Sequence, residues 1–415
     1  MRRRLRRPFA PLTLPGYRRF FLSQAFARCG VWIQVVAELW LVLKLTGSGV
    51  SLGLTTALQF APMLVFGAWA GLLADRLPKR RILLAAQAWM VVPAVTLFAL
   101  TATGAVELWM VYLLVLARGF GHAVDNPVRQ SFVSEVVDPG LVPAAVSLNA
   151  ALVSSARMAG PAIGGALIAG AGVIPCFAVA AAAFLIAFAA LLSLDPGRLQ
   201  AAEPVPRRPG QLREGLRYVR SRPALLVPLA AMAVVGTLAF NFPVLLPLMA
   251  RFTFDAGAGT FGALAAAMGA GAVLGALVNA GRGKPSLRDL GTLALAFGLL
   301  TAALAAAPTL PLALAALVGV GAASAAFAAT TNSLLQLAAA PHTRGRVMAM
   351  FSVVYLGSTP LGGPIAGWVA EHAGARAGFA LAAAATLATG IAVLLLARRR
   401  AGAILGPPAG VAQFG

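Results

Sequence analysis

Long apolar stretches alternate with short polar segments along almost the entire chain. Most of these stretches hold about 20 residues or more, the length that an α-helix needs to cross roughly 30 Å of hydrocarbon. Strands of a membrane β-barrel would instead give alternating segments of about ten residues, so the pattern indicates an all-α membrane protein. It predicts twelve transmembrane helices, at residues 18–44, 50–74, 81–103, 107–127, 140–169, 172–194, 223–250, 258–280, 287–306, 309–335, 344–370 and 374–397.

A polar stretch at residues 195–223 divides this pattern into two sets of six predicted helices. Its later part, "QLREGLRYVR", places Leu212, Leu216 and Val219 at helical spacing among arginines, which predicts a short amphipathic helix on the membrane surface. The predicted domains are an N-terminal six-helix bundle at 1–195, a basic cytoplasmic linker at 196–222, a C-terminal six-helix bundle at 223–400 and a cytoplasmic tail at 401–415.

The two halves contain a related segment. Residues 138–165 and 340–367 each start at a loop proline, continue through a predicted helix and reach the pattern G-P-x-x-G, with an offset of 203 residues. Internal repeats of this kind are typical of transporters, in which the substrate site lies between the repeats near the membrane midplane. The sequence therefore predicts two pseudo-symmetric six-helix bundles with a site between them.

Composition and charge support a membrane location. Hydrophobic residues make up 60% of the chain and charged residues only 11%, against about 25% charged in a soluble domain. The net charge of +21 would suit nucleic acid, but 27 of the 33 Lys and Arg residues, Arg129 among them, lie near the termini or in alternate polar segments. Because such residues stay in the cytoplasm, we expect no nucleic-acid partner, cytoplasmic termini and a bacterial inner membrane.

Motifs for nucleotide binding, metal binding and catalysis are missing from the sequence. It contains no G-x-x-x-x-G-K-[ST] for nucleotide phosphates. Its three histidines and two cysteines, Cys29 and Cys176, do not have the spacing of a metal site. No catalytic constellation of paired polar groups stands out. We therefore expect no cofactor, no metal and no enzymatic activity.

The segment "GLLADRLPKRRIL" at residues 71–83 interrupts the apolar pattern with one acid and four bases. It resembles the signature of the loop between the second and third helices of the major facilitator superfamily, although Pro78 replaces the usual glycine. The resemblance implies a gating loop that holds the two halves together on the inner side and releases them on opening. The matching residues assigned to this role are Gly71, Asp75, Arg76, Lys79 and Arg80.

Further segments resemble the same superfamily. "ARGFG" at 117–121 is similar to the signature of its fourth helix, and "RMAGPAIGG" at 157–165 to the antiporter motif of its fifth. The fifth-helix motif residues are Gly160, Pro161, Gly164 and Gly165, with Ala156 where a further glycine is usual. "LTGSGVSLGL" at 45–54 and "NPVRQSFVSEVV" at 126–137 resemble the branch that includes enterobactin-type siderophore exporters and drug-efflux proteins.

Charged residues inside the predicted helices are candidates for proton coupling, because each costs about 2.5–3.5 kcal/mol at the membrane centre. Glu38 is the leading candidate, with snorkelling to the interface as the alternative. Arg118, His122 and Asp125 share one helical face. For Asp125, pairing with nearby bases is an equal alternative to a proton site, and for His122 a packing role is the stronger alternative.

Arginines and aromatic residues complete the candidate site. Arg28, Arg118 and Arg157 are expected to form an intramembrane charge network. For Arg157, pairing with an acid is slightly favoured over binding an anionic substrate. The candidates for lining a substrate cavity are Gln34, Trp40, Phe240, Asn241, Asn332 and Gln336. Trp32 and Phe242 are further candidates for contact with an apolar ligand, and facing lipid is the alternative for all four of these aromatic residues.

Together these features predict a monomeric secondary exporter of amphipathic small molecules, such as drugs, siderophores or secondary metabolites. Proton antiport and alternating access would drive it, with substrate, protons and membrane lipid as its partners. A lysophospholipid translocator and a non-transporting membrane receptor are the alternatives, and uptake in place of export stays open.

Overall fold

The computed structural model describes residues 9–199, 217–280, 285–340 and 343–404, and the predicted all-α architecture is confirmed. Most of the predicted amphipathic helix at 211–220 and part of the tail lie outside these residues. The N-terminal half contains η1 (Ala10–Thr13), α2 (Pro15–Thr46), α3 (Gly49–Arg76), α4 (Lys79–Ala102), α5 (Leu108–Val136), η2 (Pro139–Leu141), α6 (Val142–Ala171), α7 (Ile174–Leu192) and η3 (Pro196–Arg198). The C-terminal half contains α9 (Pro223–Leu238), α10 (Phe242–Leu248), a π-helical turn (Met249–Thr253), α11 (Ala258–Ala280), α12 (Leu287–Ala306), α13 (Leu310–Ala338), α14 (Arg344–Gly357), α15 (Thr359–Ala373) and α16 (Ala375–Ile404).

Two predicted helices are interrupted. Eleven segments of the described chain are long and apolar enough to cross a membrane. The eleventh predicted helix, 344–370, is not among them, because it folds as α14 and α15 with a break at Ser358. The predicted span 223–250 breaks between α9 and α10, just before Pro243. A proline lacks the N–H group that would bond to the preceding turn and its ring crowds that turn. When each interrupted segment is counted as one, each half has six long helical segments.

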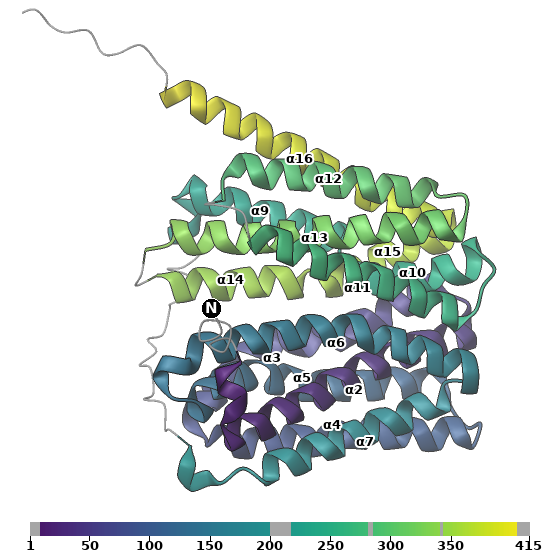
Figure 1. Ribbon diagram of the computed structural model, residues 1–415. Coiled ribbons are helices and arrows are strands. Elements are labelled where there is room, and N and C mark those ends of the chain that lie inside the picture. Colours follow the sequence, from purple (N-terminus) through teal and green to yellow (C-terminus); the bar gives the residue numbers. More distant parts are fainter. Residues whose placement is uncertain (1–8, 200–216, 281–284, 341–342, 405–415) are drawn as a thin grey trace, which may run out of the picture.

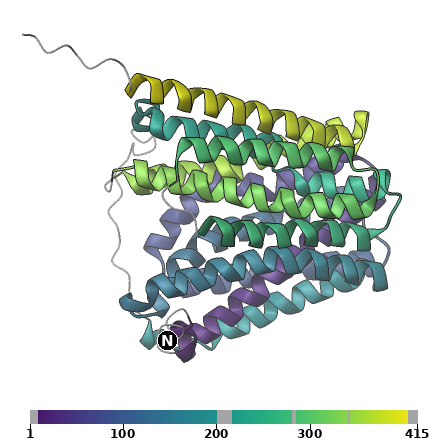
Figure 2. The same ribbon diagram turned by 45° about the horizontal axis from the view of Figure 1, so that its top comes forward.

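The two halves form separate bundles that lie side by side (Figure 1). The first described residues and the C-terminal part of α16 lie on the same side of the molecule, which we call the terminal end (Figures 1 and 2). The opposite side, the far end, carries the turns at Gly47, Gly172 and Gly374. Each of these glycines has a positive φ, between 62° and 85°, a conformation that glycine adopts without steric cost.

Glycines bring the two halves into contact toward the far end. A Cβ atom on Gly53 of α3 would lie 2.5 Å from the carbonyl oxygen of Gly363 of α15. A second contact between the halves, also toward the far end, joins α6 to α11. There a Cβ atom on Gly165 would lie 2.4 Å from the Cα of Gly262. Helices in lipid associate through such close backbone packing, because the hydrophobic effect gives little drive there. Both contacts use the repeated G-P-x-x-G segments.

Candidate functional site

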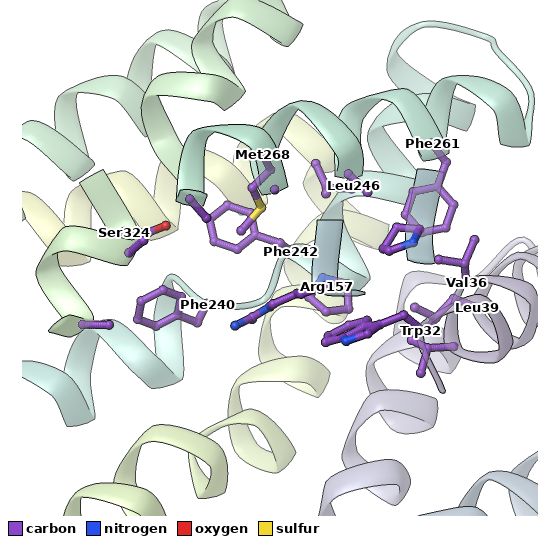
Figure 3. A pocket seen from close by; sticks show the side chains of 18 of the residues that line it. Trp32, Val36, Leu39, Arg157, Phe240, Phe242, Leu246, Phe261, Met268 and Ser324 are labelled. Atoms are coloured by element: carbon purple, nitrogen blue, oxygen red, sulfur yellow. The ribbon is translucent and has the colours of Figure 1, made fainter. Parts of the chain in front are cut away.

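A cavity of about 200 Å³ lies between the two halves. The N-terminal half contributes one face of α2, where Trp32, Val36 and Leu39 follow helical spacing. The C-terminal half contributes the break between α9 and α10, which places Phe240 and Phe242 at the cavity (Figure 3). An interrupted helix beside a central cavity is typical of transporter binding sites.

Arg157 of α6 reaches into the middle of this cavity, between Phe240 and Trp32 (Figure 3). Its guanidinium carbon lies 5.5 Å from the centre of the Trp32 ring, and its Nη1 donates a hydrogen bond of 3.4 Å to the hydroxyl of Tyr355. The Arg157 side chain is exposed to the cavity. Among the described residues that line the cavity, Arg157 is the only charged one. The slightly favoured ion pair is not found among the described residues, where no carboxylate pairs with Arg157.

Glu38 and Arg118 form a buried ion pair inside the N-terminal half. Arg118 donates hydrogen bonds of 3.0 Å and 2.6 Å to the two carboxylate oxygens of Glu38, and both side chains are almost fully buried. Gln34, one helical turn earlier on α2, donates a further bond of 2.9 Å to Glu38. Gln34 and Glu38 thus face α5, while the neighbouring positions of α2 face the cavity. Glu38 does not snorkel to the interface.

A second buried pair lies further along α5. Asp125 accepts hydrogen bonds from Arg129, one turn later on the same helix, and from Gln87 of α4 at 2.9 Å. The prediction that Arg129 lies in a polar loop is wrong: α5 continues to Val136, and Arg129 is fully buried. Asp125 therefore pairs within its own helix, and the described contacts of Lys79 and Arg80 lie elsewhere. His122 is half-buried on the same helix.

Arg28 binds Asn126, the residue after Asp125, and the described ion pairs do not include it. It donates a hydrogen bond of 3.0 Å to the side-chain oxygen of Asn126, and it is 8% exposed. Arg28 and Arg118 thus lie in the polar interior of the N-terminal half, whereas Arg157 lies at the cavity. The expected single network of three arginines is replaced by separate groups.

The predicted gating loop is only partly described. Gly71 lies in α3, whereas the side chains of Asp75 and Arg76 lie outside the described part of the chain. Lys79 forms an ion pair with Glu135 of α5. Arg80 donates hydrogen bonds to the carbonyls of Leu191 and Leu192 at the end of α7. The described contacts of both bases therefore stay within the N-terminal half.

Most of the predicted cavity candidates lie elsewhere. Phe240 lines the cavity, but the other five candidates are absent from its described lining. Trp40 stacks on Phe261 with ring centres 6.3 Å apart. Asn241 turns away from the cavity and donates to the carbonyl of Thr237. Gln34 binds Glu38, and Asn332 accepts a hydrogen bond from Gln336.

One contact between the halves was missed by the sequence analysis. The carboxylate of Glu371, at the end of α15, accepts hydrogen bonds from the Ser48 hydroxyl (2.6 Å) and the Val50 amide (2.8 Å) at the start of α3. A residue of the C-terminal half thus caps the first turn of a helix in the N-terminal half. The available signal was an acid directly after an apolar span in a chain with only 12 acids.

Comparisons with known proteins indicate that the chain is a transporter. The model of a family described as transmembrane secretion effector matches residues 6–404. Three curated relatives are transporters. The multidrug efflux pump Tap of Mycolicibacterium fortuitum is 29% identical over 90% of this chain and 94% of its own length. The uncharacterized MFS-type transporter YfiS of Bacillus subtilis is 26% identical over 53% of this chain and 53% of its own length.

The third relative is the enterobactin exporter EntS of Shigella boydii, 28% identical over 64% of each chain. The chain thus spans about half to two thirds of the length of some relatives and almost all of others. Among solved structures, a D323A mutant of the nucleoside transporter NupG superposes with a TM-score of 0.72, over 92% of this chain and 99% of that one. At 14% identity this likeness shows the fold alone.

Proposed function

Because this chain belongs to the transmembrane secretion effector family of the major facilitator superfamily, we propose that it exports amphipathic small molecules by proton antiport and alternating access. The observation that carries the proposal is the aromatic cavity between the two halves, which meet through glycines toward the far end. The resemblance to the exporter branch is confirmed by the family match and by relatives named as efflux proteins.

Alternating access requires an element with two arrangements that substrate and proton bind unequally. The close approach of α3 to α15 and of α6 to α11 supports a state that is closed at the far end. Rocking of the two bundles would open the far end and close the terminal end. With cytoplasmic termini in a bacterial inner membrane, the state described here faces inward.

Proton coupling is assigned to Glu38. Its bidentate bond to Arg118 engages both carboxylate oxygens in this state. A proton binds Glu38 only where rocking separates the pair, so proton binding and conformation are linked. Asp125 keeps its partner Arg129 within one helix, and it therefore responds less to movement between α2 and α5.

The test is transport in everted membrane vesicles from cells that produce the protein, under an imposed pH gradient. The probes are ethidium, naphthalene-2-carboxamide and naphthalene-2-carboxylate, which are cationic, neutral and anionic. We expect uptake of at least one probe into the vesicles above that of empty-vector vesicles, and its loss when nigericin collapses the gradient. Uptake that ignores the gradient contradicts antiport, and movement of no probe contradicts export.

A further inference from the structure

Among the described residues that line the central cavity, Arg157 supplies a single positive charge. Apart from Ser324 and the hydroxyl of Tyr355, the rest of this lining is apolar or aromatic. From this we infer that the transported substrates are organic anions with a ring-containing apolar body, whose acidic group binds Arg157. The inference rests on the proposed export function and names its substrate class. Three observations support it.

The first observation is that no carboxylate of the described residues compensates the charge of Arg157. By contrast, Arg118 is paired with Glu38 and Arg129 with Asp125 in the interior of the N-terminal half. Arg157 instead has an aromatic ring and a hydroxyl as its recorded partners. An arginine in a low-dielectric site is costly unless it is paired, so an anion that enters the cavity gains a partner that the described chain does not supply.

The second observation is the number of free donor groups. A guanidinium carries five N–H donors in a planar fork that matches a carboxylate with two parallel bonds. One hydrogen bond to Tyr355 is recorded for Arg157, which leaves donors for an acidic group. A positively charged substrate would instead be repelled at this point, and a neutral one would leave the cation unpaired.

The third observation is the shape of the lining. Trp32 lies beside the guanidinium, and Phe240 and Tyr355 form an edge-to-face pair with ring centres 5.7 Å apart. Aromatic walls around a charged group favour a ligand with a planar apolar body. The volume of about 200 Å³ is below the roughly 300–1,000 Å³ of drug-sized pockets, so one or two rings suit the state described here.

The test compares naphthalene-2-carboxylate with naphthalene-2-carboxamide, which has the same rings and no charge. Binding to the purified full-length protein in nanodiscs is measured by equilibrium dialysis. We expect the acid to bind at least tenfold more tightly than the amide. Arg157→Gln should remove this preference by weakening the acid alone, and Arg157→Lys should keep part of it. Arg251→Gln, which changes a cation exposed at the far end, is the control.

Equal binding of acid and amide, or an unchanged preference in Arg157→Gln, would overturn the inference. Retained binding of the amide and an unchanged thermal midpoint show that Arg157→Gln is folded. The vesicle assay separates this result from the export proposal. Gradient-driven movement of ethidium or the amide, but not of the acid, supports export and overturns the anion class. Binding of the acid with the expected dependence on Arg157, but no movement of any probe, supports the site and contradicts export.

Discussion

Among single residues, Glu38 and Arg118 show how a buried charge depends on its partner. Each is almost fully buried, and removal of one partner of such a pair costs about 3–5 kcal/mol because the other charge stays behind. We expect Glu38→Gln and Arg118→Gln each to lower the thermal midpoint of the purified protein. The double variant, which removes both charges, should recover part of this loss.

The same double variant tests Glu38 as the proton carrier, since its stability is partly restored. It should lack gradient-driven transport in everted vesicles while still binding the probe. Glu107→Gln is the control, because Glu107 is an exposed acid that bonds to Trp109 of its own half. Coupled transport by the stable double variant would remove Glu38 from the mechanism.

The sequence identified the embedded charges but not their partners. Glu38 and Arg118 stood out because charges are rare in apolar stretches, yet their 80-residue separation hides the contact between α2 and α5. Arg129 was misplaced because the apolar stretch ends near residue 127, whereas the helix continues to Val136. Hydropathy follows the lipid thickness, and a helix is free to extend beyond it.

At the scale of helices, small residues set the distance between α6 and α11. We expect Gly165→Leu to prevent this contact, because its side chain would overlap the backbone of Gly262, and overpacking costs about 1–3 kcal/mol. The closed far end should then become less populated by about fivefold or more. Spin labels at Thr103 and Thr309, both exposed on far-end turns, would report this as longer distances by double electron–electron resonance.

Gly170→Leu on the same helix is the matched control, because a Cβ there meets nothing within 4 Å. An unchanged distance distribution in Gly165→Leu would show that this contact does not hold the far end closed. Equal effects of both substitutions would point to altered insertion of α6 in place of altered packing.

Helix positions were largely predictable, whereas helix breaks were not. The alternation of apolar and polar segments located the membrane segments, because lipid thickness fixes their length. Prolines did not reveal the breaks: Pro93, Pro127 and Pro161 all lie inside continuous helices. A proline alone is therefore not enough to produce the break before Pro243. The sequence analysis thus named Trp32, Phe240 and Phe242 but missed most of the other lining residues.

For the whole molecule, Glu371 adds a polar contact between the halves to the glycine contacts at the far end. The internal repeat predicted two related halves, but this bond joins residues from non-equivalent positions and so has no repeat signal. Hydrogen bonds to a charged group contribute about 1.5–3 kcal/mol, and solvent exposure of Glu371 reduces this to roughly 1 kcal/mol. Loss of the bond should therefore shift the closed population by about fivefold.

Glu371→Ala tests this contact because it removes both hydrogen bonds to the start of α3 without adding bulk. The label pair at Thr103 and Thr309 should show an increased long-distance population, since the halves then separate more readily. Glu107→Ala removes a far-end acid whose bond stays within one half, so it should leave the distribution unchanged. If Glu371→Ala also leaves it unchanged, the glycine contacts alone hold the far end closed. A shift in Glu371→Ala alone would instead show that rocking of the bundles must break a polar bond between them as well as separate their glycines.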